Sequence, residues 1–323
     1  MWYNGAKKTT KERKIKLRPF SYHVHTQFCD GKNTAEEMVL AAIKAGFDSL
    51  GFSSHGHVAK VPNTNADHLA MADGDTLYTD RTKTKVKLYG YSPKSPVLYG
   101  MKEESIELYR AEVLRLAEAY KDKINIFLGI EQDSFARLEH IPKGARYVIG
   151  SVHYVEKNGS YISVDYSADV LSRGVGDLFG GDYLAYAEAY YKEVERVYDK
   201  TLCDIVGHID LLTKFNEKAP LIDESHPRYR NAALSAAEAL ARRGLIFEIN
   251  TGAISRGLRT TPYPTEEILR VIRESGGRIT YSSDCHKAEF IGCAFEDAVA
   301  LAKKCGFKGF MKLSDKGFYE EEF

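Results

Sequence analysis

The sequence lacks the features that would assign it to several special classes of protein. Its five Cys include no C-x-x-C spacing, which argues against a disulfide framework and for free thiols in a reducing compartment. Its 45 Lys and Arg residues balance 45 Asp and Glu residues, so no net field recruits nucleic acid or an anionic membrane. No apolar run approaches membrane-spanning length, and the basic stretch 1–18 has no apolar segment of a secretory signal. We therefore expect a cytoplasmic protein.

Short apolar runs of strand length recur along the 323 residues, and most are separated by segments with apolar residues at helical spacing. The runs are 17–24, 48–54, 124–130, 147–152, 204–207, 245–250 and 278–283. The helical segments are 34–45, 103–120, 183–200, 227–243, 265–275 and 295–305. The first of them opens with the capping box Thr34-x-x-Glu37. Alternation repeated this often indicates a parallel sheet wrapped by helices.

Metal-binding side chains stand at the ends of most of these predicted strands. His23 and His25 end the first run, and because residues i and i+2 of a strand point to one face, both aim at one point. Later runs lead to His55, Glu131, His153, His208 and the pair Asp284 and His286. A (β/α) barrel explains this distribution, because its active site is built at the C-terminal rim of the strands. The alternative, a doubly wound open sheet, draws its site from few strands at one switch point.

The other four of the ten His residues follow no predicted strand directly. His57 shares a loop with His55, so an approach to the metals or the substrate stays open. We expect His68, His140 and His226 at the surface.

Segment 57–100 breaks the pattern, because it has no clear apolar period and is rich in Asp, Thr, Lys, Tyr, Pro and Gly. We expect an insertion without regular structure, which is either a lid over the rim or a loop with no catalytic role. Its Asp67, His68, Asp73 and Asp75 are expected to be solvated rather than to bind metal.

The order and content of these motifs resemble the polymerase and histidinol phosphatase (PHP) superfamily. The matching segments are Tyr22-His-Val-His-Thr with Cys29-Asp30-Gly31, Phe52-Ser-Ser-His55-Gly, Gly129-Ile-Glu131-Gln-Asp133, Gly150-Ser-Val-His153, Gly207-His208-Ile-Asp210 and Ser283-Asp284-Cys-His286. The segment from Glu248 to Pro264 is similar to the histidinol-phosphatase branch. The likeness covers nearly the whole chain after residue 17. It implies a distorted (β/α)7 TIM-like barrel over residues 18–323, with an N-terminal extension of residues 1–17 and an insertion at about 57–100.

The resemblance implies a centre of three divalent metal ions. The first ion would be held by His23, His25, Glu131 and Asp284, the second by Glu131, His153 and His208, and the third by Asp30, His55 and His286. Imidazoles and carboxylates without thiolate suit Zn, Fe or Mn better than Ca or Mg, and the ligand types do not decide among the three. Strand alternation points Cys285 away from the site, and we expect neither Cys285 nor Cys29 to be a ligand.

The resemblance also implies hydrolysis of L-histidinol phosphate to L-histidinol and phosphate in histidine biosynthesis. We expect direct attack by a metal-bridging hydroxide without a phosphoenzyme, since the sequence has no Gly-x-Ser-x-Gly elbow, P-loop or Cys-x5-Arg motif. Glu131 and Asp284 are the expected catalytic ligands, and either Asp30 or a metal-bound water protonates the leaving alkoxide. Arg256 and Arg259 follow a strand end, and we expect at least one of them to bind phosphate.

Two further carboxylates, Asp133 and Asp210, stand two residues beyond Glu131 and His208. Each is expected either to orient a ligand His or to recognise the ammonium group of the substrate, and the sequence does not choose between these roles.

Two other classes of function compete with a small-molecule phosphatase. A phosphoesterase acting on nucleotides or nucleic-acid ends would need a basic track. This alternative is supported by one local basic cluster, Arg81, Lys83, Lys85 and Lys87. A non-catalytic metal module would have a closed site of saturated ligands, whereas nine ligands around three ions leave positions for water and phosphate. We therefore expect a small phosphate ester as partner and neither nucleic acid nor a membrane, in an oligomeric state that the sequence leaves open.

Overall fold

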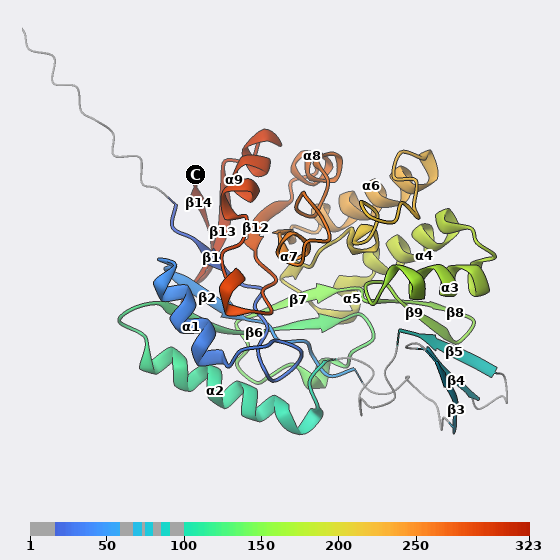
Figure 1. The fold of residues 1–323 in the computed structure, drawn as a ribbon. Coiled ribbons are helices and arrows are strands. Elements are labelled where there is room, and N and C mark those ends of the chain that lie inside the picture. Colours follow the sequence, from blue (N-terminus) through green and yellow to red (C-terminus); the bar gives the residue numbers. More distant parts are fainter. Residues whose placement is uncertain (1–16, 59–66, 73–74, 80–84, 91–99) are drawn as a thin grey trace, which may run out of the picture.

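Seven parallel strands form the body of the molecule in the computed structural model, which describes residues 17–58, 67–72, 75–79, 85–90 and 100–323 (Figure 1). In spatial order they are β1 (Phe20–Ser21), β2 (Ser49–Phe52), β6 (Asn125–Asp133), β7 (Tyr147–Ser151), β10 (Ile205–Val206), β11 (Ile246–Asn250) and β12 (Arg278–Ser282). Each strand corresponds to one of the apolar runs in the sequence. Most of the expected N-terminal extension, residues 1–16, lies outside the described residues.

The first and last strands approach each other, so the sheet curves into a nearly closed barrel. A parallel bridge joins Val24 to Cys285, and the amide N–H of His25 donates to the Cys285 carbonyl at 2.9 Å. The expected distorted (β/α)7 barrel is confirmed. Side chains that follow the first and the last strand therefore meet at one rim.

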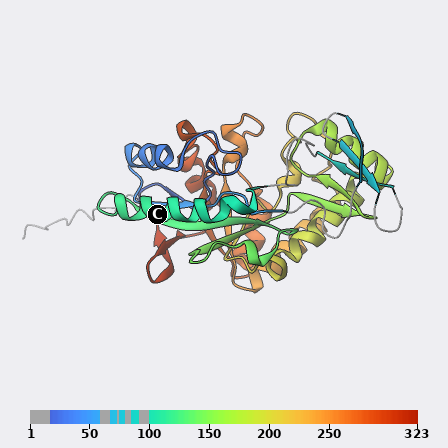
Figure 2. The ribbon, with the colours of Figure 1, turned by 90° about the horizontal axis from the view of Figure 1, so that it is seen from below.

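The helices lie mainly on the outside of the barrel, and α2 runs along the side nearest the viewer in Figure 2. They are α1 (Ala35–Lys44), α2 (Ile106–Ala119), α3 (Ala168–Phe179), α4 (Tyr183–Glu195), α5 (Val197–Thr201), α6 (Pro227–Arg242), α7 (Gly252–Ser255), α8 (Glu266–Glu274) and α9 (Phe295–Lys304). The predicted capping box is present at α1, where Thr34 and Glu37 bond to each other's backbone N–H. No helix among the described residues is long and apolar enough to cross a bilayer.

Helix α3 was not predicted, because Gly174 and Gly176 interrupt its helical pattern. Gly174 is needed for packing, since a Cβ at this position would lie 2.8 Å from the side chain of Ile162 on β9 (Ser160–Ser163). Glycine at this position lets the helix lie close against its strand, but it also weakens the helical pattern in the sequence.

A second, smaller sheet takes three of its strands from the insertion. Its order is β3 (Asp67–Ala72), β4 (Asp75–Thr79), β5 (Lys85–Tyr89), β9 and β8 (Tyr154–Lys157). Strand β5 pairs with β9 in parallel, and the other neighbours are antiparallel. The expectation that segment 57–100 has no regular structure is wrong for these strands. A strand such as β5 alternates Lys with apolar residues and so contains no continuous apolar run.

The Asp and His residues considered as ligands in the insertion divide into two groups. Asp75 is buried rather than solvated, and its carboxylate accepts from Arg173 Nε at 3.1 Å and lies 3.5 Å from Lys87 Nζ. The side chains of Asp67 and His68, and the whole of Asp73, lie outside the described residues. The described carboxylate is thus neutralised by protein cations.

A buried tyrosine fixes the first two strands just below the rim. The hydroxyl of Tyr147 lies 2.6 Å from the main-chain carbonyl oxygen of Tyr22 and 3.0 Å from that of Phe52. Its ring fills the space that Gly129 leaves, since a Cβ there would lie 2.2 Å from the ring. The ends of β1 and β2 are therefore held in register immediately before the residues that carry imidazoles.

A C-terminal hairpin of β13 (Gly309–Ser314) and β14 (Gly317–Glu322) packs against the first and last strands of the barrel. The hydroxyl of Thr280 donates to the carbonyl of Met311 at 2.8 Å, and the amide of Leu313 donates to the hydroxyl of Tyr22 at 2.8 Å. The hairpin thus joins β1 and β12 near their meeting point.

Candidate metal centre

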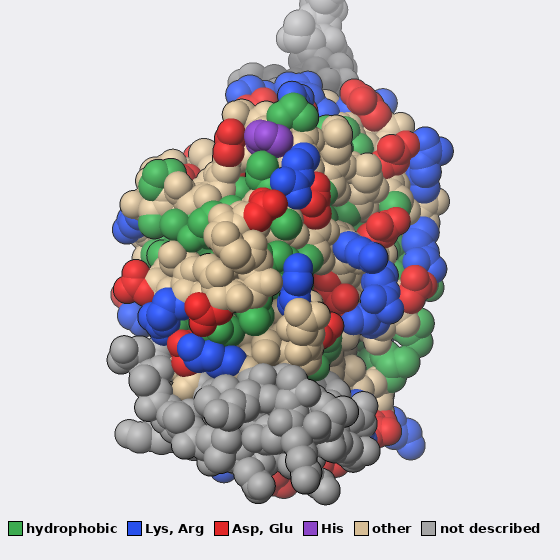
Figure 3. Space-filling view, turned by 90° about the vertical axis from the view of Figure 1, so that its right-hand side faces the viewer, with side chains coloured by type: hydrophobic (Ala, Val, Ile, Leu, Met, Phe, Trp, Pro, Cys, Tyr) green, Lys and Arg blue, Asp and Glu red, His purple; other side chains and the backbone are tan. Residues whose placement is uncertain are grey.

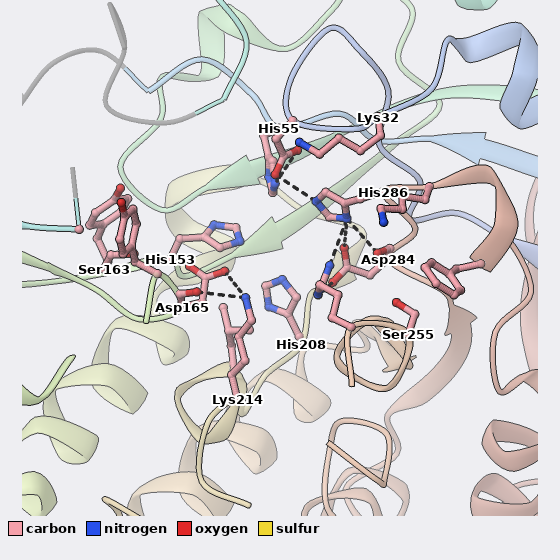
Figure 4. Close-up of a pocket in the computed structure, with 18 residues that line it drawn as sticks. Lys32, His55, His153, Ser163, Asp165, His208, Lys214, Ser255, Asp284 and His286 are labelled. Atoms are coloured by element: carbon pink, nitrogen blue, oxygen red, sulfur yellow. Dashed lines mark hydrogen bonds and ion pairs between the residues drawn. The ribbon is translucent and has the colours of Figure 1, made fainter. Parts of the chain in front are cut away.

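Nine side chains meet at the C-terminal rim of the barrel. They form overlapping groups of three or four residues, and within each group the ligand atoms lie within 4.8 Å of one another. They are His23, His25, Asp30, His55, Glu131, His153, His208, Asp284 and His286. The structure brings together every side chain that the sequence suggested as a metal ligand. Figure 4 shows the part of this cluster that faces the cavity.

Glu131, on β6, is buried at the centre of the cluster. Its Oε2 lies 3.0 Å from Nε2 of His23 and 2.6 Å from Nδ1 of His55. Its Oε1 lies 3.3 Å from Nε2 of His153 and 3.1 Å from Nε2 of His208. The two oxygens face different imidazoles, so each is available as a separate ligand atom.

Two further carboxylates reach the cluster from different segments. Asp284, just after β12, places Oδ1 3.2 Å from Nε2 of His25, and Asp30, in the loop after β1, places Oδ2 3.1 Å from Nε2 of His286. Asp284 has a φ of 44°, in the left-handed region where Asp is one of the better tolerated residues. A Cβ at Gly252 would lie 2.6 Å from Asp284 Oδ2, so this glycine makes room for the carboxylate.

Several buried ligand atoms make no hydrogen bond within the described part of the chain. They are Nε2 of His23, Nε2 of His25 and both carboxylate oxygens of Glu131, although buried polar atoms normally have such partners. The two Nε2 atoms lie 3.0 and 3.5 Å from Glu131 Oε2, close to the separation expected of two ligands at about 2.0–2.2 Å from one ion. The residues therefore fit transition-metal cations, and the imidazole and carboxylate donors suit Zn, Fe or Mn.

Two carboxylates behind the ligands orient the imidazoles. Glu248, on β11, accepts from Nδ1 of His23 at 2.9 Å and from the amide of His208 at 2.6 Å. Asp133 accepts from Nδ1 of His153 at 3.1 Å. Bonds of this kind fix the ring orientation and the tautomer in which Nε2 is the ligand atom.

Glu248 was not predicted to have a function of its own. The sequence does contain a signal, because Glu248 lies within the apolar run 245–250, and a charge in a buried strand needs a partner. For Asp133, the expected support of a ligand His agrees with its bond to His153. Asp210 instead accepts from the amide of Thr265 at 3.1 Å, and among the described residues its carboxylate makes no hydrogen bond or ion pair with a ligand His.

The carboxylates of the centre are ionised at neutral pH. Burial alone would raise the pKa of Glu131, but the neighbouring His23, His55 and His153 hold that pKa well below its usual value. Burial would likewise raise the pKa of Asp284, and Arg256 and His23 hold it well below the usual value. The negative charge of these side chains favours cations.

The centre opens into a cavity of about 730 Å³, a volume typical of a small-molecule site (Figure 4). Arg256, which follows α7, lines this cavity, and its guanidinium lies 3.0 Å from Asp284 Oδ2 and 3.1 Å from His286 Nδ1. Arg259 is buried and donates to the carbonyl of Thr213 at 3.2 Å. The structure therefore places Arg256 beside the metal ligands and Arg259 behind the wall of the cavity.

An ion pair that was not predicted lines another part of the cavity. Nζ of Lys214 lies 2.9 Å from Asp165 Oδ2 (Figure 4). Asp165 follows a strand of the smaller sheet, and Lys214 follows a short 3-10 turn after β10. Asp165 stands two residues after β9, a strand that the sequence analysis did not predict, and Lys214 follows no strand directly, so the pattern that located the metal ligands includes neither residue.

The remaining Cys and His expectations have mixed outcomes. The thiol of Cys285 donates to the carbonyl of Lys287 at 2.8 Å, and burial raises the pKa of the Cys29 thiol to about 12, so both favour the uncharged form. His226 caps α6 as expected of a residue near the surface. His140 is buried, so its expected surface position is wrong.

Of the basic cluster of the insertion, the structure describes only the side chain of Lys87. Lys87 is paired with Asp75 and Asp177, at 3.5 and 3.7 Å. Arg81, Lys83 and the side chain of Lys85 lie outside the described residues. On the face shown in Figure 3, Lys and Arg are interspersed with Asp and Glu.

A nearly closed barrel with imidazoles and carboxylates converging at its rim defines a class of barrel proteins with a metal-binding site. The family model for the PHP domain matches residues 21–252, and the chain belongs to this family.

Known proteins are similar over nearly the whole chain. A "Probable histidinol-phosphatase" of Schizosaccharomyces pombe is 27% identical over 308 residues, which are 89% of this chain and 87% of that protein. The histidinol-phosphatase of Bacillus subtilis is 25% identical over 300 residues, which are 88% of this chain and 98% of that protein. A crystal structure of a histidinol phosphate phosphatase from Lactococcus lactis, complexed with zinc, L-histidinol and phosphate, has a TM-score of 0.62 at 20% identity and covers 94% of this chain and 100% of that chain.

Proposed function

We propose that this chain is a metal-dependent phosphomonoesterase that hydrolyses L-histidinol phosphate to L-histidinol and phosphate in histidine biosynthesis. The observation that carries the proposal is the convergence of nine metal-binding side chains on a small-molecule cavity beside Arg256. The histidinol-phosphatases that are similar over most of their length support the substrate. We place the enzyme in the cytoplasm, with this phosphate ester as its partner.

The centre would hold three divalent transition-metal ions, and the Lactococcus structure supports zinc. The proposed sets are His23, His25, Glu131 and Asp284, then Glu131, His153 and His208, and finally Asp30, His55 and His286. The Oε1 side of Glu131 supports the second set, because it faces the rings of His153 and His208, whereas Oε2 lies beside His23 of the first set and His55 of the third. When bound, the ions lower the pKa of water, neutralise phosphoryl charge and hold the attacking and leaving oxygens in line.

Arg256 is the proposed phosphate clamp of the protein. Its two terminal nitrogens lie beside Asp284 and His286, at 3.0 and 3.1 Å. A planar guanidinium binds two phosphoryl oxygens at once. In the proposed complex the guanidinium of Arg256 donates hydrogen bonds to the phosphate instead of to these side chains, and so adds a positive charge beside the metal ligands.

Asp30 is the proposed carrier of the proton. The Asp30 side chain is half exposed, and although partial desolvation would raise the pKa of its carboxyl, His55 and His286 hold that pKa well below its usual value, so Asp30 is ionised at neutral pH. The carboxylate takes one proton from the attacking water and returns it to the leaving alkoxide. The reaction then balances, since one water and one monoester give the free alcohol and phosphate.

Asp165 is proposed to recognise the ammonium group of the substrate. Lys214 holds it in place and, against the effect of burial, keeps the pKa of its carboxyl well below the usual value. We expect Asp165→Asn to raise KM for L-histidinol phosphate while KM for p-nitrophenyl phosphate, which has no ammonium, stays unchanged. The matched control is Asp177→Asn, whose carboxylate lies at the surface beside Lys87. Equal changes for both substrates would contradict this assignment.

The experiment that tests the function compares substrates at defined metal content. Phosphate release is measured from L-histidinol phosphate, from nucleoside monophosphates and from end-phosphorylated single-stranded DNA, with zinc, manganese or iron supplied. The proposal expects the highest kcat/KM for L-histidinol phosphate and the loss of activity in Glu131→Gln. A higher kcat/KM for a nucleotide would overturn the substrate, and full activity after chelation would overturn the use of metal.

A further inference from the structure

A second group of imidazoles lies apart from the nine side chains of the centre. His57 follows β2, Glu103 begins the 3-10 turn before α2, and His140 ends the 3-10 turn after β6. One candidate ligand atom from each of these residues lies within 4.8 Å of the others. The proposed hydrolysis makes no use of this group.

The hydrogen bonds of the two rings determine which nitrogen is available. Nδ1 of His57 lies 2.9 Å from the carbonyl oxygen of Met101, and Nδ1 of His140 lies 3.3 Å from the carbonyl oxygen of His57. A carbonyl oxygen only accepts, so each Nδ1 carries the ring proton and the neutral ring keeps its lone pair on Nε2. Main-chain carbonyls orient many metal-binding imidazoles in this way.

The positions of the three side chains suit a metal ion. The two rings are 9% and 7% exposed, and their centroids lie 4.7 Å apart at an interplanar angle of 88°. Nε2 of His140 lies 3.8 Å from Oε1 of Glu103, and tetrahedral zinc needs its ligand atoms about 3.3–3.5 Å apart. The side chain of Glu103 is 72% exposed, so it is able to move by the small distance that remains.

We propose that His57, Glu103 and His140 bind one divalent transition-metal ion of the zinc class, with water as a fourth ligand. Two neutral imidazoles and one carboxylate leave the bound ion with a net positive charge at the surface. The ion joins three segments that are distant in sequence: the turn after β2 and the two 3-10 turns.

The same segments support the catalytic centre through their backbone. The amide of Gly56 donates to the carbonyl of Glu131 at 2.7 Å, and the amide of Met101 donates to the carbonyl of His55 at 3.0 Å. An ion at this second group therefore holds together the backbone segments that position two ligands of the centre, His55 and Glu131. Its role is structural, and it needs no contact with substrate.

The number of bound zinc ions tests the proposal. His140→Asn is the main variant, because the amide nitrogen of Asn replaces Nδ1 as donor to the His57 carbonyl while Nε2 is lost. The control is His226→Asn, which alters a ring that caps α6 through Nδ1. Wild type, variant and control are saturated with zinc, desalted and analysed for zinc per chain by mass spectrometry. We expect one zinc fewer in His140→Asn than in wild type, and an unchanged number in the control.

Glu103→Gln keeps the proposal testable if His140→Asn does not fold, because Glu103 is exposed. We expect this variant to bind the additional zinc at least tenfold more weakly in a titration followed by calorimetry. Equal zinc content in wild type and His140→Asn, or equal affinity in wild type and Glu103→Gln, would overturn the second site. The result is independent of the proposed hydrolysis, since the readout is metal content and not activity.

Discussion

Carboxylates serve the centre in two different ways at the scale of single residues. Glu131 and Asp284 face the imidazoles from the side where cations fit, whereas Glu248 and Asp133 hold imidazoles from behind. The second kind determines which ring nitrogen carries the proton, and so which nitrogen is able to bind a metal. Substitutions of these supporting carboxylates are therefore expected to reduce metal affinity.

Glu248→Gln is expected to weaken metal binding about 10- to 100-fold, in line with other residues that support ligand imidazoles. Both oxygens of Glu248 accept hydrogen bonds, one from His23 and the other from His208 and Asn250, but Gln offers a single acceptor oxygen. The measurement is metal affinity in competition with a chelator. The control is Glu238→Gln, which removes a surface carboxylate that pairs with Arg242 on α6. An unchanged affinity in Glu248→Gln would contradict the role.

Arg256→Met is expected to lower kcat/KM about 10- to 100-fold, because a hydrogen bond to a charged group contributes about 1.5–3 kcal/mol. Metal content should stay near that of wild type, since Arg256 is not a ligand. Arg259→Met is the matched comparison. Because Arg259 bonds to Thr213, we expect this variant to have a lower melting temperature than Arg256→Met and a smaller loss of kcat/KM. Steady-state kinetics and thermal unfolding separate the two. The reverse pattern would make Arg259 the phosphate ligand.

At the scale of secondary structure, the barrel and its ligands follow from one pattern in the sequence. Each strand of a parallel barrel is buried on both faces and reads as an apolar run, and the first polar residues after it lie at the rim. This is why His55, His153 and His208 were recognisable from their positions alone. The length of the strands was not predictable, since β1 and β10 each have only two residues in the sheet.

The features that were missed depend on contacts between segments distant in sequence. Glu248 supports the centre through its hydrogen bond with His23, which is 225 positions away in the sequence. Lys214 and Asp165 meet because the smaller sheet lies beside the rim of the barrel (Figure 1), and no local pattern encodes that placement. Strands β3, β4 and β5 contain polar residues and no long apolar run, and β5 joins them to β9, which is more than 70 positions further along the chain.

Tyr147→Phe is expected to destabilise the protein by about 1–3 kcal/mol, the usual result of leaving buried polar groups without a partner. The carbonyls of Tyr22 and Phe52 would both lose the hydroxyl that lies within hydrogen-bond distance of them. Urea unfolding of the metal-free protein measures the change. Tyr183→Phe is the control, because its hydroxyl bonds to Ser172 at an exposed position. Equal stabilities of the two variants would show that Tyr147 does not hold the strand ends.

At the scale of the whole molecule, a buried acid connects stability to pH. Burial raises the pKa of Asp210 from 3.8 to about 6, although Arg259 opposes the shift. The folded protein therefore binds this proton more tightly than the unfolded chain. Ionisation of Asp210 lowers the free energy of unfolding as pH rises from about 4 to about 6, and the loss persists at higher pH.

Asp210→Asn is expected to be more stable than wild type above pH 6, by up to about 3 kcal/mol from the size of the pKa shift. Asn is unable to ionise, and its side-chain oxygen still accepts the hydrogen bond from the amide of Thr265. Urea unfolding of both proteins in a chelator, at intervals from pH 4 to pH 8, should show the difference shrinking toward pH 4. A difference that is constant over this range would contradict the assignment.

The bridge between Val24 and Cys285 also affects how the protein matures. Because the flanking His23, His25, Asp284 and His286 belong to one site, a nascent chain presents its first imidazoles early and its last carboxylate and imidazole late. Residue 286 must leave the ribosome before the full set of ligands exists. The proposed first and third ligand sets, which need Asp284 or His286, are therefore expected to fill only after most of translation, when the metal supply of the cell meets an almost finished polypeptide.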